Sequence, residues 1–257
     1  MKKFALLVLL LICCSSVAFS QKGNTTKQTF TINGVEFAMV YVEGGTFTMG
    51  ATSEQGSEAD DDEKPTHSVT LSSYYIGETE VTQALWQAVM ENNLYRFKGD
   101  NLPVKQVSYE DIQKFITKLN QKTGKTFRLP TEAEWEFAAR GGKKSKGYKY
   151  SGSNNINDVA WYSENSDGKP HIVKTKQANE LGIYDMSGNV LEWCSDRYGS
   201  YSGSSQTNPS GANSGYNRVL RGGCWDSHAK YCRVSNRDND YPSYEIDGSG
   251  FRLVLSK

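Results

Sequence analysis

The chain has 257 residues, with 29 basic and 29 acidic side chains and therefore no formal net charge. This balance gives no indication of nucleic acid or an anionic membrane as a partner. Aromatic residues make up 12% of the chain, glycines number 24 and aliphatic residues are few, which favours an irregular, loop-rich fold with short strands over an α/β enzyme built on a continuous parallel sheet.

The amino terminus has the features of an export signal. Two lysines precede an apolar run over residues 4–12, and small residues follow it. The run is shorter than the roughly 20 residues that a membrane span requires, so no stable span is expected. We predict that residues 1–20 are a cleaved signal peptide and that the protein is secreted or periplasmic. A second interpretation, a lipid anchor on Cys13 or Cys14, lacks the usual small residues before the cysteine.

The mature chain is predicted to be one domain, residues 37–257, preceded by an N-terminal tail over residues 21–36. Strand patterns cover residues 37–42 and 46–50, on either side of a glycine pair. Strand character resumes from residue 67. The first part of the mature chain is therefore expected to be mainly strand.

Three helices with recognisable caps follow these strands. Thr82 precedes apolar residues at helical spacing, and Ser108 stands three residues before an aspartate. Thr131 and Glu134 match a capping box directly after a proline. Beyond residue 142 the sequence shows almost no helical periodicity, so the second half of the chain is expected to consist of short strands and loops.

The last forty residues combine buried strands with a polar, aromatic segment. Val219 and Leu220 precede this segment and residues 251–255 follow it, and between them aliphatic side chains are nearly absent. Tyrosines with small polar residues are typical of recognition surfaces. The predicted binding residues are Trp225, Asp226, Ser227, His228, Tyr231, Asn236, Asp238, Asn239, Asp240, Tyr241 and Tyr244. The alternative is that they form an ordinary solvated loop.

Six motifs resemble, in order, those of the formylglycine-generating enzyme, or sulfatase-modifying factor, family. They are Val42-Glu-Gly-Gly-Thr-Phe-Thr-Met-Gly, Pro65-Thr-His-Ser-Val-Thr-Leu, Glu80-Val-Thr, Arg128-Leu-Pro-Thr-Glu-Ala-Glu-Trp-Glu-Phe-Ala-Ala-Arg-Gly-Gly, Asn179-Glu-Leu-Gly-Ile-Tyr-Asp-Met-Ser-Gly-Asn-Val-Leu-Glu-Trp, and Arg221-Gly-Gly to Gly250-Phe-Arg-Leu. The resemblance implies a single α+β domain of the C-type-lectin-like kind, with short strands, about three helices and much irregular structure. It also implies calcium binding and, in the enzymes, oxidation of a sulfatase cysteine to formylglycine with copper and oxygen.

The last segment also resembles the variable region of lectin-fold proteins that retroelements diversify. In those proteins, changeable surface positions lie between Arg-Gly-Gly and Gly-Phe-Arg sequences like those at 221–223 and 250–252. The resemblance implies ligand binding through this segment.

A calcium site is implied near the fifth motif. The ligands that the resemblance implies are Asp185, Gly188, Val190 and Glu192. Two carboxylates flanking a tight turn, with backbone carbonyls between them, suit a hard cation. The alternative is that Asp185 caps the turn and Glu192 pairs with an arginine such as Arg197 or Arg221.

The copper site of the enzyme family is incomplete in this sequence. That family places two cysteines on the fourth and ninth residues after the Gly-Gly, and soft sulfur ligands suit copper(I). Here these positions are Ser227 and Cys232. Cys224 lies three residues before Ser227, which on an extended strand is about 10 Å away and on the opposite face. Copper is therefore not expected, and Cys232 is catalytic only if the protein is an enzyme.

One disulfide is expected in an exported protein. Signal cleavage would leave Cys194, Cys224 and Cys232. We predict a Cys194–Cys232 bridge, because the strand that carries the first and the motif that carries the second are expected to be neighbours in this fold.

The sequence thus predicts an exported ligand-binding or accessory module whose partner is a protein or a carbohydrate. The alternative function is a formylglycine-generating oxidase.

Overall fold

A computed structural model describes residues 26–92 and 98–256. The predicted signal peptide at 1–20 and the alternative lipid anchors at Cys13 and Cys14 lie outside the described residues, so both stay predictions. Among the described residues, no helix is both long and apolar enough to cross a membrane.

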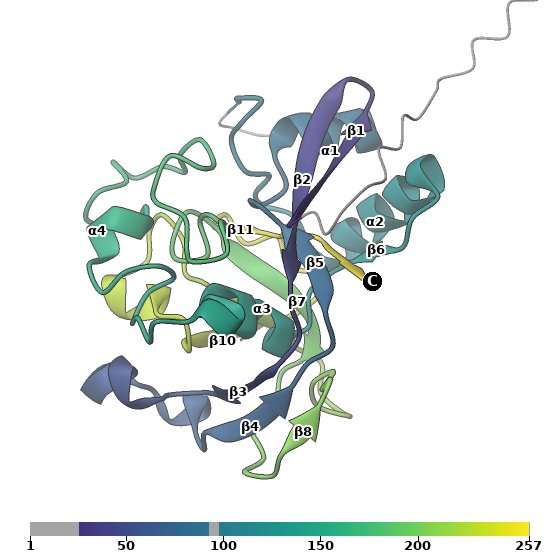
Figure 1. Cartoon of the computed structure of the whole chain (residues 1–257). Coiled ribbons are helices and arrows are strands. Elements are labelled where there is room, and N and C mark those ends of the chain that lie inside the picture. The colour runs from purple at the N-terminus through teal and green to yellow at the C-terminus, as the bar shows by residue number, and fades with distance from the viewer. Residues whose placement is uncertain (1–25, 93–97, 257) are drawn as a thin grey trace, which may run out of the picture.

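The three main helices begin where their caps predict (Figure 1). The hydroxyls of Thr82 and Ser108 accept backbone amides of the first helical turn, and Thr131 and Glu134 form the predicted capping box. The helices are α1 (Gln83–Met90), α2 (Tyr109–Thr123), α3 (Glu132–Ala139) and the single turn α4 (Ile156–Val159). The short 3-10 turns are η1 (Ser53–Glu58), η2 (Asp61–Glu63), η3 (Gly142–Lys144) and η4 (Ala229–Cys232).

Short strands form three small sheets. Their orders are β1-β2-β5-β12-β6, β10-β9-β7-β11 and β3-β4-β8. The strands of the first sheet are β1 (Lys27–Ile32), β2 (Val35–Val42), β5 (Tyr74–Gly77), β12 (Val254–Ser256) and β6 (Phe127–Arg128). Those of the second are β10 (Arg237–Asp240), β9 (Arg218–Arg221), β7 (Leu191–Arg197) and β11 (Ser249–Gly250). Those of the third are β3 (Thr46–Met49), β4 (His67–Thr70) and β8 (Gln206–Thr207).

The ordered domain begins earlier than the predicted boundary at residue 37. β1 pairs with β2 along its whole length through a hairpin at Asn33-Gly34, where both residues have positive φ. Phe30 packs on Phe37 with ring centroids 5.4 Å apart. Part of the predicted tail, residues 27–36, therefore consists of β1, the hairpin turn and the first two residues of β2. Its alternation of apolar and polar residues was too loose to identify as a strand.

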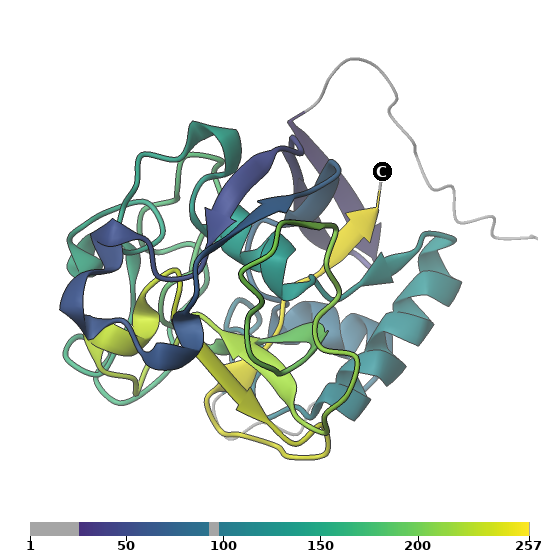
Figure 2. The same cartoon turned by 90° about the horizontal axis from the view of Figure 1, so that it is seen from below.

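The C-terminal strand closes the domain. β12 lies between β5 and β6 in the first sheet, whereas β9, β10 and β11 belong to the second, so the last forty residues connect the two sheets. Every residue of α3 is buried, and this helix packs against β3, β7 and β9 (Figures 1 and 2). The result confirms the predicted α+β fold, with few helices and curled sheets.

Candidate functional site

The C-terminal segment contains a strand that the sequence did not predict. β10 pairs antiparallel with β9, so that Arg237 lies opposite Arg221 and Asp240 lies opposite Arg218. The polar stretch after Arg237 therefore begins as an edge strand of the second sheet and becomes a loop only at Tyr241. Aspartate and asparagine are depleted in strands, so composition pointed away from this assignment.

Two glycines set the sharp turn after β9. Gly222 and Gly223 have φ of 97° and 70°. A Cβ on Gly223 would lie 2.8 Å from the Cys232 sulfur, and a Cβ on Gly222 would lie 3.1 Å from the Trp135 ring. Larger side chains would therefore be strained and crowded at both positions. The Gly-Gly pair determines how the following turn meets the core.

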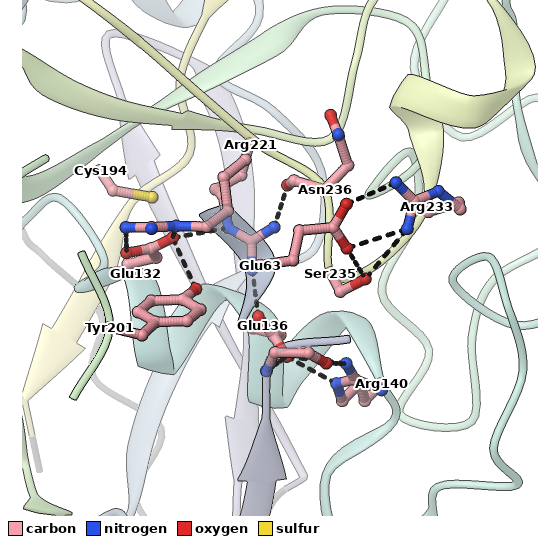
Figure 3. Close-up of polar contacts among 12 residues, drawn as sticks. Glu63, Glu132, Glu136, Arg140, Cys194, Tyr201, Arg221, Arg233, Ser235 and Asn236 are labelled. Carbon is pink, nitrogen blue, oxygen red and sulfur yellow. Dashed lines mark hydrogen bonds and ion pairs between the residues drawn. The ribbon is translucent and has the colours of Figure 1, made fainter. Parts of the chain in front are cut away.

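Four buried arginines anchor the C-terminal segment to the rest of the fold. Each pairs with a glutamate from outside the segment, and Figure 3 shows the two pairs at Glu136 and Glu63. The pairs are Arg221–Glu136, Arg233–Glu63, Arg237–Glu132 and Arg252–Glu192. The Arg252 pair is bidentate, with both N–O distances 2.6 Å. Because both partners are buried in every pair, loss of one would leave an uncompensated charge in the core.

The electrostatics of these carboxylates show how strongly the arginines act. Burial alone would raise the pKa of Glu132, but the Arg237 and Arg221 guanidiniums outweigh it and the pKa is lowered. Burial opposes ionisation of Glu63 in the same way, and hydrogen bonds from Arg233 and Ser235 lower its pKa. The carboxylates therefore stay charged inside the core.

Most of the predicted binding residues are accessible. Tyr231 is 39% exposed, with the Lys230 ammonium 4.4 Å from its ring centroid. The exposed members of the set are Asp226, His228, Tyr231, Asp238, Tyr241 and Tyr244. The half-buried members are Trp225, Ser227, Asn239 and Asp240. Asn236 is the exception, because it is buried, and its backbone carbonyl accepts a hydrogen bond from Arg221.

Cys224 lies much closer to Ser227 than an extended strand would allow. The Ser227 amide donates to the Cys224 carbonyl at 2.9 Å, and the Cys224 sulfur lies 3.4 Å from the Ser227 hydroxyl. The predicted separation of about 10 Å is wrong, because residues 224–227 form a tight turn. Burial raises the pKa of the Cys224 and Cys232 thiols, so both favour the protonated form at neutral pH.

The predicted Cys194–Cys232 disulfide does not form. All three described cysteines are free and buried. Cys194 packs in the large apolar cluster with Trp135 and Val219, whereas Cys232 packs in a separate small cluster with Tyr150 and Tyr162. The strand and the terminal motif are neighbours, but these two side chains point into different clusters.

The predicted calcium ligands have unequal surroundings. Both oxygens of Glu192 accept from Arg252, and one also accepts from the Trp135 indole at 2.8 Å. This is the ion-pair alternative, with Arg252 in place of Arg197 or Arg221 as the partner. Gly188 and Val190 lie in the turn between the carboxylates, and both are buried.

Asp185 has an unpaired oxygen. The structure also places Glu80 near it, a neighbour that the sequence did not predict. One Asp185 oxygen accepts the Lys174 amide at 2.7 Å, whereas the other is buried with no hydrogen-bond partner. Glu80 is also buried with one unpaired oxygen, and its other oxygen accepts from Asn189 at 3.1 Å. Burial raises the pKa of Asp185 to about 6, and burial together with the Asp185 charge raises that of Glu80. The Glu80-Val-Thr motif was the only sequence signal for Glu80.

A cation at this position would need main-chain oxygens as well. Among the residues that the structure describes, no three His, Cys, Asp or Glu side chains converge as a metal site. Asp185 and Glu80 together supply two unpaired carboxylate oxygens in a buried setting. That donor set suits a hard cation if carbonyls or waters complete it.

The comparison with known families agrees with the motifs. Residues 27–257 match the sulfatase-modifying factor enzyme 1-like domain. The chain belongs to this family. It is 30% identical to the formylglycine-generating enzyme of Streptomyces coelicolor, over 84% of this chain and 88% of that protein. It is 33% identical to the chaperone protein LppX of Paenibacillus barcinonensis, over the full length of both.

A solved structure with a similar fold comes from a variable protein. The structure of Treponema denticola variable protein 1 superposes with a TM-score of 0.82 and 35% identity, covering 91% of this chain and all of that one. This chain is therefore similar both to a formylglycine-generating enzyme and to a protein named for its variability.

Proposed function

We propose that this family member is a binding or accessory module that recognises a protein or carbohydrate ligand through its C-terminal surface. We define that surface by the accessible members of the predicted set: Trp225, Asp226, Ser227, His228, Tyr231, Asp238, Asn239, Asp240, Tyr241 and Tyr244. One observation carries the proposal. Different residues of the C-terminal segment hold it in place and face the solvent. Buried arginines paired with glutamates hold it in place, and the side chains listed above face the solvent.

That separation is what a recognition surface requires. Ligand contacts lose less entropy when their backbone is already held in place, and tyrosines supply contact area with few rotatable bonds. Exposed positions can change without removing an anchor. The likeness to Treponema denticola variable protein 1 supports the same interpretation.

The oxidase is the second candidate, and one observation favours it. The Cys224 thiol lies beside Ser227, the position where the enzyme family has a copper ligand. Against it, the family positions hold one hydroxyl and one fully buried thiol whose pKa burial raises. Copper(I) prefers two thiolates, so the residues present do not fit that ion. We therefore favour binding over oxidation.

We also propose that Asp185 and Glu80 hold a structural calcium ion. Their two unpaired, buried oxygens support this, and Glu192 is replaced as a ligand because it is committed to Arg252. Bound calcium would supply positive charge between two carboxylates that otherwise repel each other in the core. Export through residues 1–20, to the periplasm or the medium, stays part of the proposal.

Site-specific photocrosslinking tests the binding function. A benzophenone amino acid is placed at Tyr231 or Tyr244, with Ile172 as the control because it is exposed but lies outside the segment. Irradiation of cells that produce each variant should give a defined adduct at the tyrosine positions and none at Ile172. Excess wild-type protein should abolish the adduct, whereas protein with serine at all exposed positions of the C-terminal surface should not. Equal adducts at all three sites would contradict the proposal.

A further inference from the structure

The end of β10 and the loop that follows it carry a concentration of negative charge. Within residues 238–247 there are four acidic side chains and no basic one, although the whole chain is neutral. Asp247 pairs with the buried Lys105. In the part of the chain that the structure describes, Asp238, Asp240 and Glu245 make no ion pair. Three carboxylates, two on β10 and one in the loop after it, are therefore available to a partner.

Two exposed tyrosines lie between Asp240 and Glu245 in the sequence. Tyr241 and Tyr244 are 49% and 55% exposed, and their ring centroids are 5.3 Å apart. Tyr216, 86% exposed, precedes Asn217, whose side chain donates to Asn239 at 2.6 Å and so brings the preceding loop against this one. Aromatic rings left in water next to anionic groups suit an ammonium or guanidinium group, which gains from both.

The surroundings do not neutralise the loop. Arg218 lies opposite Asp240 in the sheet, but its guanidinium stacks 4.6 Å from the Tyr109 ring centroid and donates to the Ser195 carbonyl. The exposed Glu110 lies beside the loop, since its amide donates to the Pro242 carbonyl. Arg218 is therefore engaged with other groups, and Glu110 adds one more negative charge beside the loop.

The backbone of the edge strand is already occupied. The amides of Asn239 and Tyr241 donate to the carboxylates of Asp238 and Asp240, each at 2.7 Å. Such local caps disfavour the addition of another strand to an exposed sheet edge. A partner would therefore be recognised through the side chains of β10 and of the loop after it.

We propose that the surface formed by Asp238, Asp240, Tyr241, Tyr244 and Glu245 binds a lysine- or arginine-rich segment of a partner protein. Charge complementarity selects this occupant: three carboxylates without ion pairs attract basic side chains, and the two rings accept their cationic ends. This inference rests on the proposed binding function and names the chemistry of the ligand.

Fluorescence anisotropy with two short labelled peptides tests it. One alternates lysine and serine, and the other has glutamate in place of lysine. The wild type should bind only the lysine peptide, and more weakly as salt rises, because exposed charges are screened. Asp238→Asn, Asp240→Asn and Glu245→Gln together should weaken binding about tenfold, roughly the combined effect of three exposed ion pairs. Tyr241→Leu with Tyr244→Leu should weaken it with all charges kept.

A matched control separates a specific surface from general charge attraction. Glu36→Gln, Asp100→Asn and Asp167→Asn remove the same charge from exposed positions elsewhere. This variant should bind the lysine peptide with the same affinity as the wild type. An equal loss of affinity in both triple variants would overturn the proposal. Absence of lysine-peptide binding by the wild type would also overturn it.

Two other outcomes would replace the basic segment while leaving a binding module in place. These are binding of a neutral oligosaccharide that Tyr244→Leu abolishes, and concentration-dependent dimerisation that the same substitution abolishes. Failure of the crosslinking experiment, by contrast, would remove the binding function itself.

Discussion

Replacing Arg233 with alanine should lower the free energy of unfolding by about 3–5 kcal/mol. Arg233 and Glu63 are both fully buried, with N–O distances of 2.5 and 2.9 Å, and Ser235 donates to the same carboxylate. Within the described residues, the substitution leaves Glu63 charged in the core with hydrogen bonds from the Ser235 hydroxyl and the Asp60 amide alone. Urea unfolding, followed by tryptophan fluorescence, measures the change.

The control for this prediction lies two residues away in the chain. Tyr231→Ala changes an exposed side chain and should cost less than about 0.5 kcal/mol. If Arg233→Ala fails to fold, Glu63→Gln with Arg233→Met should recover a folded protein, because it removes both charges together. Equal unfolding curves for Arg233→Ala and Tyr231→Ala would show that the buried pair does not hold the segment.

Calcium should raise the thermal stability of the protein through Asp185 and Glu80. An ion that binds only the folded state stabilises it by about 2.7 kcal/mol at one hundred times its Kd. A strong chelator should therefore lower the Tm, and added calcium should restore it. Differential scanning calorimetry with and without calcium gives the comparison.

Substitutions of buried acidic residues show whether the rise in Tm with calcium depends on the Asp185 and Glu80 site. Asp185→Asn and Glu80→Gln should each abolish the calcium-dependent part of the Tm. Asp196→Asn provides the matched control. Asp196 is about as buried as Asp185 and Glu80, but it lies on β7 and has no buried oxygen without a hydrogen-bond partner. A wild type whose Tm is the same in chelator and in calcium would contradict the proposal.

Local features of the fold could be predicted from the sequence, because short-range rules control them. The caps at Thr82, Ser108 and Thr131 each act within one helical turn, and all three helices start there. The buried ion pairs were invisible in the same sequence. Glu63 and Arg233 are 170 positions apart, and nothing local distinguishes them from surface charges.

The candidate site shows the same division. Ser227 could be identified by counting from the Gly-Gly, and this revealed the incomplete copper pair. Its distance from Cys224 was misjudged, since a tight turn replaces the extended strand that was assumed. The sequence identifies Glu80 only as part of a motif, because its approach to Asp185 depends on packing between distant segments.

A peptide-oxidation assay tests the central claim, binding rather than oxidation, most directly. The purified protein is incubated with copper(I), oxygen and a sulfatase-type Cys-x-Pro-x-Arg peptide, and mass spectrometry follows the peptide cysteine. The Streptomyces coelicolor formylglycine-generating enzyme, a relative of this chain, is the positive control. We predict that the cysteine stays unchanged with this protein while the control converts it to formylglycine. Catalytic conversion by the wild type, lost in Cys232→Ala, would contradict the account.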